Sequence, residues 1–195
     1  NHLFLRDRQS ATNWALTTAE ILAEAMTPDG RFVAFLVSPS PPDSYLYVWD
    51  SAWSTLVYTN TISGYNNRNL AISPDGNRIA FYTLGQLRLA DRAAQTDWLV
   101  TAIASSLTVV PHFSGDGNWL TYARTQGLWT QIYLYDVRNR TELLVSHAMN
   151  STVGGGGNSD VPDISPDGRF VSYRTAATNI VAGVNGLIRQ IILYN

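Results

Sequence analysis

Residues 165–173 read Ser165-Pro166-Asp167-Gly168-Arg169-Phe170-Val171-Ser172-Tyr173, and three other stretches of the chain repeat this turn and the β-rich run after it. The other turns are Thr27-Pro28-Asp29-Gly30, Ser73-Pro74-Asp75-Gly76 and Ser114-Gly115-Asp116-Gly117. Their aspartates lie at positions 29, 75, 116 and 167, so that successive copies are 46, 41 and 51 residues apart. A period of this length suits a repeat whose unit is a four-stranded β-sheet.

The turn itself has a clear conformational logic. Proline presets φ at the first central position, an aspartate side chain can accept a hydrogen bond from the nearby backbone, and glycine adopts a positive φ at low cost. Placed between two runs of alternating apolar residues, such a turn predicts a β-hairpin. We therefore interpret Asp29, Asp75, Asp116 and Asp167 as turn-forming residues rather than catalytic carboxylates.

A second pattern follows each hairpin and also opens the chain. Large apolar residues alternate with variable ones and end in aspartate or asparagine, which predicts a half-buried third strand. The copies are Leu3–Asp7, Leu46–Asp50, Leu87–Asp91, Ile132–Asp136 and Ile191–Asn195. A fourth strand is predicted after an Asp-led turn, at Trp14–Thr18, Ser54–Thr59, Asp97–Ala102 and Glu142–Ser146.

At these residues the chain resembles the PD40, or WD40-like, repeat of TolB-type β-propellers. The Ser165–Tyr173 hairpin and the aliphatic-Tyr-aliphatic-Tyr-Asp strand Ile132–Asp136 carry the resemblance. It implies an all-β propeller of four-stranded antiparallel blades, with roughly six to eight blades around a central channel, in the bacterial periplasm or outside the cell. It also implies either a protein-binding platform of the TolB kind or the propeller that precedes the hydrolase domain of a prolyl-oligopeptidase-like peptidase.

The repeat divides the chain into a partial blade at 1–19, three blades at 20–62, 63–104 and 105–149, and an incomplete blade at 150–195. Two arrangements fit. The chain is a segment of a larger propeller, or its N-terminal fourth strand completes the last blade and closes a four-bladed ring with one redundant strand. We favour the first, because the family prefers larger rings and the chain starts at Asn1 rather than methionine. In both arrangements the open strand edges should pair with something.

Three segments do not fit the strand patterns. Ser38–Asp43 contains three prolines and is predicted to be a loop. The glycine run in Gly154–Asp160 is predicted to be a flexible linker and not a phosphate-binding loop, because no helix follows it. Ala177–Arg189, which includes Val184-Asn185-Gly186, is the longest connection between a second and a third strand. It lacks the carboxylates that a calcium site requires.

Composition excludes several classes of function. The net charge is −2, and the thirteen basic residues are all arginines without a basic stripe, which argues against a nucleic-acid partner. The sequence contains no cysteine, so it has no disulfide, no thiolate metal site and no cysteine nucleophile. No apolar run approaches the roughly 20 residues that span a bilayer, and no signal-peptide pattern opens the chain.

Residues with catalytic potential are few and scattered. The histidines are His2, His112 and His147, and none has the spacing of a metal site. We expect His112 to be a partly buried sheet residue. The sequence contains no Gly-x-Ser-x-Gly nucleophile elbow, and without lysine it has no Ser-x-x-Lys or Schiff-base chemistry. We therefore predict no catalytic, cofactor-binding or metal-binding residues, no cofactor, and no enzymatic activity in this chain.

The tryptophans offer the main material for recognition. We expect them mainly to pack between blades, although exposed ones would suit protein or carbohydrate binding. The leading hypothesis is a non-catalytic protein-binding or assembly module that uses a propeller face or its open strand edges. A peptidase propeller is the alternative, and a carbohydrate-binding or lyase propeller is weaker because the histidines are scattered. The tryptophans are Trp14, Trp49, Trp53, Trp98, Trp119 and Trp129.

Overall fold

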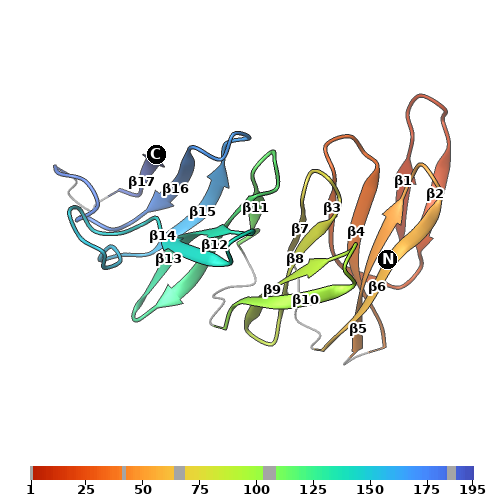
Figure 1. Ribbon diagram of the computed structural model, residues 1–195, viewed down its shortest axis with the longest axis horizontal. Helices are drawn as coiled ribbons and strands as arrows, with labels where there is room; N and C mark the ends of the chain where they lie inside the picture. Colours follow the sequence, from red (N-terminus) through yellow and green to blue (C-terminus); the bar gives the residue numbers. More distant parts are fainter. Residues whose placement is uncertain (1, 41–42, 64–68, 103–108, 184–187) are drawn as a thin grey trace.

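The regular structure of the described residues is entirely antiparallel β-sheet. The computed structural model describes residues 2–40, 43–63, 69–102, 109–183 and 188–195. Within them, 17 strands form one two-stranded, three four-stranded and one three-stranded sheet (Figure 1). None of the described residues belongs to a helix long and apolar enough to cross a bilayer. The all-β prediction is confirmed.

The sheets follow one another along the chain, and within each sheet the strands pair in chain order. The first contains β1 (Leu3–Arg6) and β2 (Asn13–Thr17), and the second contains β3 (Glu20–Met26), β4 (Phe32–Ser40), β5 (Asp43–Asp50) and β6 (Thr55–Ser63). The third contains β7 (Leu70–Ile72), β8 (Arg78–Thr83), β9 (Gln86–Asp91) and β10 (Thr96–Thr101). The fourth contains β11 (His112–Phe113), β12 (Trp119–Gln126), β13 (Trp129–Asp136) and β14 (Thr141–Leu144), and the fifth β15 (Ser159–Ile164), β16 (Val171–Thr175) and β17 (Gln190–Tyr194).

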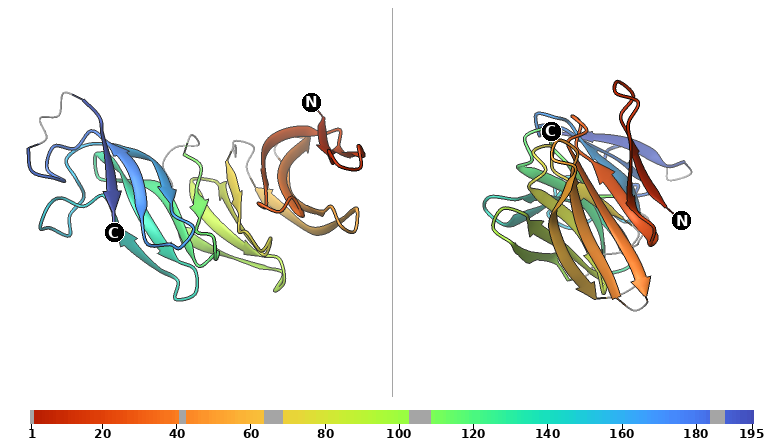
Figure 2. Two further views of the ribbon diagram at one scale, coloured as in Figure 1. Left: turned by 90° about the horizontal axis from the view of Figure 1, so that it is seen from above. Right: turned by 90° about the vertical axis from the view of Figure 1, so that its right-hand side faces the viewer.

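The arrangement of the sheets is open. They stand side by side in chain order, and the two termini lie at opposite ends of the molecule (Figures 1 and 2). Among the described residues β2 pairs only with β1, and β17 pairs only with β16. The N-terminal strands therefore do not complete the last sheet, and the four-bladed closed ring is not formed.

The four turns share one hydrogen-bond pattern. In the first, Thr27 Oγ1 donates to Asp29 Oδ1 at 2.6 Å and accepts from the backbone N–H of Phe32 at 2.9 Å. The Asp29 carboxylate also accepts from the backbone N–H of Arg31 at 3.0 Å. Serine at positions 73, 114 and 165 makes the equivalent bonds in the other three turns. The turn glycines have φ between 68° and 74°, so the turn-forming role of these aspartates accounts for their contacts.

These bonds predict a loss of stability in acid. The hydrogen bond from Thr27 lowers the pKa of Asp29, and Ser114 and Ser165 lower the pKa values of Asp116 and Asp167 in the same way. Because the pKa is depressed in the folded state, the stabilisation is complete above the unfolded value of about 3.9 and is lost as pH falls through the lower folded value.

We expect the melting temperature to fall steeply below about pH 4. Asparagine at the three aspartates keeps the turn geometry but removes the titration, so the triple variant should show a flatter profile between pH 4 and 2. Thermal unfolding followed by circular dichroism tests this. Identical profiles for both proteins would mean that other carboxyl groups carry the acid sensitivity.

The apolar core lies between sheets rather than within one sheet. In β5, Leu46 and Val48 are fully buried against the third sheet, while Tyr47 and Trp49 pack on the other face against β1 and β2. This two-sided burial recurs at each junction, which is why the third strands show large apolar residues at successive positions. The second, third and fourth sheets therefore depend on a neighbour on each side for burial.

The prediction of a loop at Ser38–Asp43 is wrong for the residues that can be described. Strand β4 continues through Pro39 to Ser40, which pairs with Asp43 in β5 after a register shift that follows Val37. Pairing with β3 ends at Ser38, so Pro39 needs no amide donor there, and a bulge tolerates proline. Residues 41 and 42 and the predicted Val184-Asn185-Gly186 turn lie outside the described residues.

The glycine run is also not a free linker. The N–H of Gly155 donates to the carbonyl of Ser146 at 2.8 Å, and the N–H of Gly156 donates to Asn179 Oδ1 at 2.8 Å. Gly155 and Gly157 are buried. Glycine is required here because the backbone of the 176–177 segment approaches closely, not because the chain must be flexible.

Adding a methyl group at Gly157 should destabilise the protein. A Cβ there would lie 2.7 Å from the backbone carbonyl carbon of Ala176, and backbone cannot yield cheaply. We expect Gly157→Ala to lower the free energy of unfolding by about 2 kcal/mol. Gly156→Ala is the control, because its Cβ would stay 3.6 Å from Asn179. Urea denaturation of the two variants measures the difference, and equal stabilities would contradict the close approach.

Candidate interaction surface

The first strands of four successive sheets lie next to one another. β3 contacts β7, β7 contacts β11, and β11 contacts β15. Each is the edge strand of its sheet, and in a propeller such strands surround the central channel. Exposed residues of β3, β11 and β15, together with Val110 just before β11, form a surface here called the inner strip, whereas the residues of β7 are buried. The inner strip consists of Glu24, Met26, Val110, His112, Val161 and Asp163.

The inner strip combines exposed apolar groups with charges. Met26 is 55% exposed and Val161 is 61% exposed, although both lie in strands. A groove of about 300 Å³ runs over β3, β7 and β11 and is lined by Met26, Val110 and His112 among others. Exposed apolar side chains beside polar ones are typical of protein-binding surfaces.

Val161 is held in an unusual backbone conformation. Its φ is 52°, in the left-handed region that a β-branched residue rarely adopts. It lies between Asp160 and Asp163, where the register of β15 against β16 shifts. The left-handed conformation costs roughly 1–2 kcal/mol for a residue with a Cβ, yet it places an exposed apolar side chain on the inner strip. Local strain of this kind clusters at functional sites.

His112 connects two sheets across the inner strip. Its Nδ1 lies 3.4 Å from Asp163 Oδ1, and the His112 side chain is 44% exposed. His112 lies in β11, as the sequence predicts, and with 44% of its side chain exposed it is only partly buried. His147 packs edge-on against Tyr194 at 5.8 Å. The described residues contain no cluster of three potential metal ligands.

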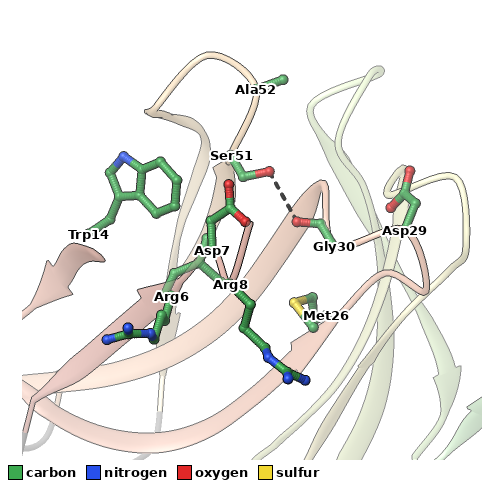
Figure 3. Close-up of a pocket in the computed structure, with 10 residues that line it drawn as sticks. Arg6, Asp7, Arg8, Trp14, Met26, Asp29, Gly30, Ser51 and Ala52 are labelled. Atoms are coloured by element: carbon green, nitrogen blue, oxygen red, sulfur yellow. Dashed lines mark hydrogen bonds between the residues drawn. The ribbon is translucent and has the colours of Figure 1, made fainter. Parts of the chain in front are cut away.

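A second groove opens on the face that carries the Asp-Gly turns. It has a volume of about 490 Å³ and lies between the first and second sheets (Figure 3). Asp7 and Arg8 from the turn after β1 and Trp14 from β2 form one side, while Met26 and Gly30 form the other. Asp7 accepts hydrogen bonds from the backbone N–H of Gln9 at 2.8 Å and from Ser10 Oγ at 2.6 Å, and the bond from Ser10 lowers its pKa.

A groove of about 520 Å³ also lies at the next junction, but there an aromatic ring covers the turn glycine. There the ring of Phe32 lies against Gly76, with the guanidinium carbons of Arg31 and Arg92 at 4.8 and 4.6 Å from the ring centroid. Asp50, the counterpart of Asp7, forms an ion pair with Arg31 at 3.2 Å. The groove of Figure 3 therefore differs from its neighbour by lacking an aromatic residue over the turn glycine.

The outward face of the last sheet is apolar and uncovered. Ile191 and Leu193 of β17 are 82% and 68% exposed. The residues at the same positions of the third strands β5, β9 and β13 are buried by the following sheet, and they are Leu46, Val48, Leu87, Leu89, Ile132 and Leu134. Among the described residues, no further sheet packs on this face of β17.

The tryptophans divide between packing and exposure. Trp119 packs against the core cluster between the fourth and fifth sheets, which includes Val171 and Tyr173. Trp98 lies in the preceding core and donates from Nε1 to the hydroxyl of Tyr135 at 3.0 Å. Trp53 and Trp129 are exposed, but neither lies on the inner strip. The inner strip was not predicted from the sequence, because its residues come from different sheets that only the fold brings together.

Comparison with solved structures identifies the fold. The chain is similar to the tricorn protease, with a TM-score of 0.72 and 11% identity over 98% of this chain and 19% of the protease. It is also similar to TolB from Acinetobacter baumannii, with a TM-score of 0.60 and 20% identity over 99% of this chain and 49% of that protein. For TolB from Agrobacterium tumefaciens the TM-score is 0.58 and the identity 20%, over 98% of this chain and 65% of that one.

These similarities show a TolB-like β-propeller fold of partial coverage, as the turn repeat predicted. The chain spans less than two thirds of the length of each of these proteins. No family model and no curated protein sequence matches it.

Proposed function

We propose that this chain is the recognition surface of a larger β-propeller, a non-catalytic scaffold that binds a protein segment along the inner strip. The observation that carries the proposal is Val161, which is exposed, apolar and kept at φ 52°. Backbone strain at an exposed residue lowers the stability of the protein without improving its packing, so such a residue is a candidate for a functional role. The groove beside Met26 and Val110 extends the same surface.

The scaffold is expected in the periplasm or outside a bacterial cell. This follows from the resemblance to TolB, in which the propeller is a protein-binding platform. Separation of cytoplasmic, periplasmic and extracellular fractions of the native source, followed by immunoblotting, tests the location. Recovery of the protein with cytoplasmic markers would count against it.

Photo-crosslinking tests the binding surface directly. We place p-benzoylphenylalanine at Met26 or Val110 of the inner strip and, as controls, at Leu99 of β10 or Leu143 of β14. The controls are similarly exposed apolar residues on outer strands. The proposal is supported if both inner-strip positions crosslink to the same protein and the control positions give no crosslinked product. Equal yields from strip and control positions would refute it.

Val161→Gly separates function from stability. Glycine removes both the strain and the apolar side chain, so the variant should melt no lower than the wild type and should capture less of the crosslinked partner. A variant that binds fully would show that Val161 does not contribute to recognition.

The alternative is the propeller portion of a peptidase, with its hydrolase domain elsewhere in the polypeptide. The similarity to a solved protease favours it. Purification of the native polypeptide, followed by labelling with a fluorophosphonate probe for serine hydrolases, distinguishes the two. Labelling of the same polypeptide would favour the peptidase, whereas an unlabelled polypeptide that still crosslinks through the inner strip would favour the scaffold.

A further inference from the structure

The turn glycines are junction positions, and only the first of them is uncovered. A Cβ on Gly76 would overlap the ring of Phe32, 2.6 Å from its Cγ, and a Cβ on Gly168 would lie 2.7 Å from Trp119 Cδ1. A Cβ on Gly117 would lie 3.3 Å from Ser73 Cβ. A Cβ on Gly30 would meet nothing within 4 Å. The preceding sheet thus covers three of the four turns.

At two of the three covered turns the covering residue is aromatic and occupies the same position in the repeat, whereas Ser73 covers Gly117. Phe32 and Trp119 each lie two residues after the glycine of their own turn, at the start of the second strand of a sheet. The first sheet consists of β1 and β2 alone, which correspond by sequence pattern to the third and fourth strands of a unit. Among the described residues no hairpin precedes β1, and none covers Gly30.

The free edge of β1 completes the site. β1 pairs with β2 on one side, and on the other it has no partner among the described residues. In the next sheet the strand at that position, β4, pairs with β5 from Phe32↔Asp50 onward. A strand added to β1 in the same register would bring its first residue opposite Asp7 and therefore over the groove that contains Gly30.

Asp7 adds a charge preference. Its counterpart Asp50 pairs with Arg31, and the counterpart Asp91 accepts a hydrogen bond from Asn77 Nδ2 at 3.2 Å. Both donors directly follow the turn glycine. An aromatic residue follows the donor in Asp29-Gly30-Arg31-Phe32, and Asp116-Gly117-Asn118-Trp119 has the same pattern, although Asn118 donates to Asp116 of its own turn. The complementary hairpin is therefore expected to read Asp-Gly, then arginine or asparagine, then an aromatic residue.

We propose that β1 and the groove at Gly30 form a docking socket for such a β-hairpin, supplied by a preceding repeat of the same polypeptide. Its second strand extends the sheet at β1, its aromatic side chain covers Gly30, and its arginine or asparagine binds Asp7. The affinity comes from main-chain pairing, and the specificity comes from the aromatic residue.

A hairpin transplanted from within the chain tests the proposal. Residues Val109–Gln131 are fused directly ahead of Leu3, so that Leu3 takes the place of Ile132 and the copied Trp119 reaches Gly30. We expect amide exchange in β1 to slow at least about tenfold and the melting temperature to rise by about 4 °C. The matched control carries alanine at the copied tryptophan and should keep less than half of the rise.

Unchanged exchange in β1 would overturn the edge docking, and an alanine control as stable as the tryptophan fusion would overturn the aromatic socket. If the fusion aggregates, the synthetic peptide 109–131 is added to the unfused chain and the exchange of β1 is measured, with the same two outcomes. Sedimentation of the unfused chain tests whether the docking hairpin comes from a preceding repeat or from a second copy of the chain. Dimers that protect β1 without any added hairpin would show that a second copy, not a preceding repeat, occupies the socket.

Discussion

Gly76→Ala is expected to lower the free energy of unfolding by about 3 kcal/mol, the sum of backbone strain and a steric clash. The glycine has φ 71°, which costs any residue with a Cβ roughly 1–2 kcal/mol. The new methyl group would also overlap the ring of Phe32, which is 6% exposed and fixed between two arginines. Urea denaturation of wild type and variant measures the loss.

Gly30→Ala is the control that separates the two causes. Its φ of 74° imposes the same strain, but its Cβ would meet nothing within 4 Å. We expect this variant to lose only about 1 kcal/mol. A double-mutant cycle with Phe32→Ala tests the steric clash directly. Without the ring, Gly76→Ala should lower the free energy of unfolding by about 2 kcal/mol less than it does in the wild type. Additive effects would show that the ring does not rest on Gly76.

Gly30 and Gly76 show which features of the structure can be predicted from the sequence and which cannot. Asp29-Gly30 and Asp75-Gly76 belong to the same motif, and the motif alone predicts the hairpin, the positive φ and the period of the sheets. What differs is the neighbouring sheet, which covers one glycine and not the other. No local pattern encodes that difference, because it depends on which strands precede the turn in space.

The remaining differences have the same origin. The glycine run from Gly154 to Gly157 has the composition of a linker, yet it is packed because residues 176–177 approach its backbone. Pro39 stays in β4 because the partner strand ends before it. The inner strip was not predicted because its residues come from β3, from β15 and from the segment around β11, and only the packing of these sheets brings them together. Sequence periodicity predicts strands well when they are long and covered on both faces.

Gln131→Leu is expected to lower the free energy of unfolding by about 3 kcal/mol, because it removes the acceptor of the buried Ser146 hydroxyl proton and the side-chain donor to the Gly155 carbonyl. Gln131 is 1% exposed in β13. Its Oε1 accepts from Ser146 Oγ at 2.5 Å, and its Nε2 donates to the carbonyl of Gly155 at 2.8 Å. Leucine is similar in size, so the loss reports mainly on these hydrogen bonds, which tie β13 to the connection between the fourth and fifth sheets.

Gln131→Glu distinguishes the lost hydrogen bond from a change of shape. At pH 7 the carboxylate keeps an acceptor for Ser146 but faces the carbonyl of Gly155 without a proton to donate. Burial raises the pKa of this glutamate above its unfolded value of about 4.3, so the protonated form, which can donate to Gly155, is favoured in the folded state. A group with a raised folded pKa stabilises below that value and loses the effect as pH rises through it. The stability of the variant relative to wild type should therefore increase as pH falls from 7 to 5, measured by urea denaturation at each pH. If the difference in free energy of unfolding between the variant and the wild type stays constant from pH 7 to 5, the hydrogen bond donated to Gly155 does not hold the connection between the fourth and fifth sheets in place.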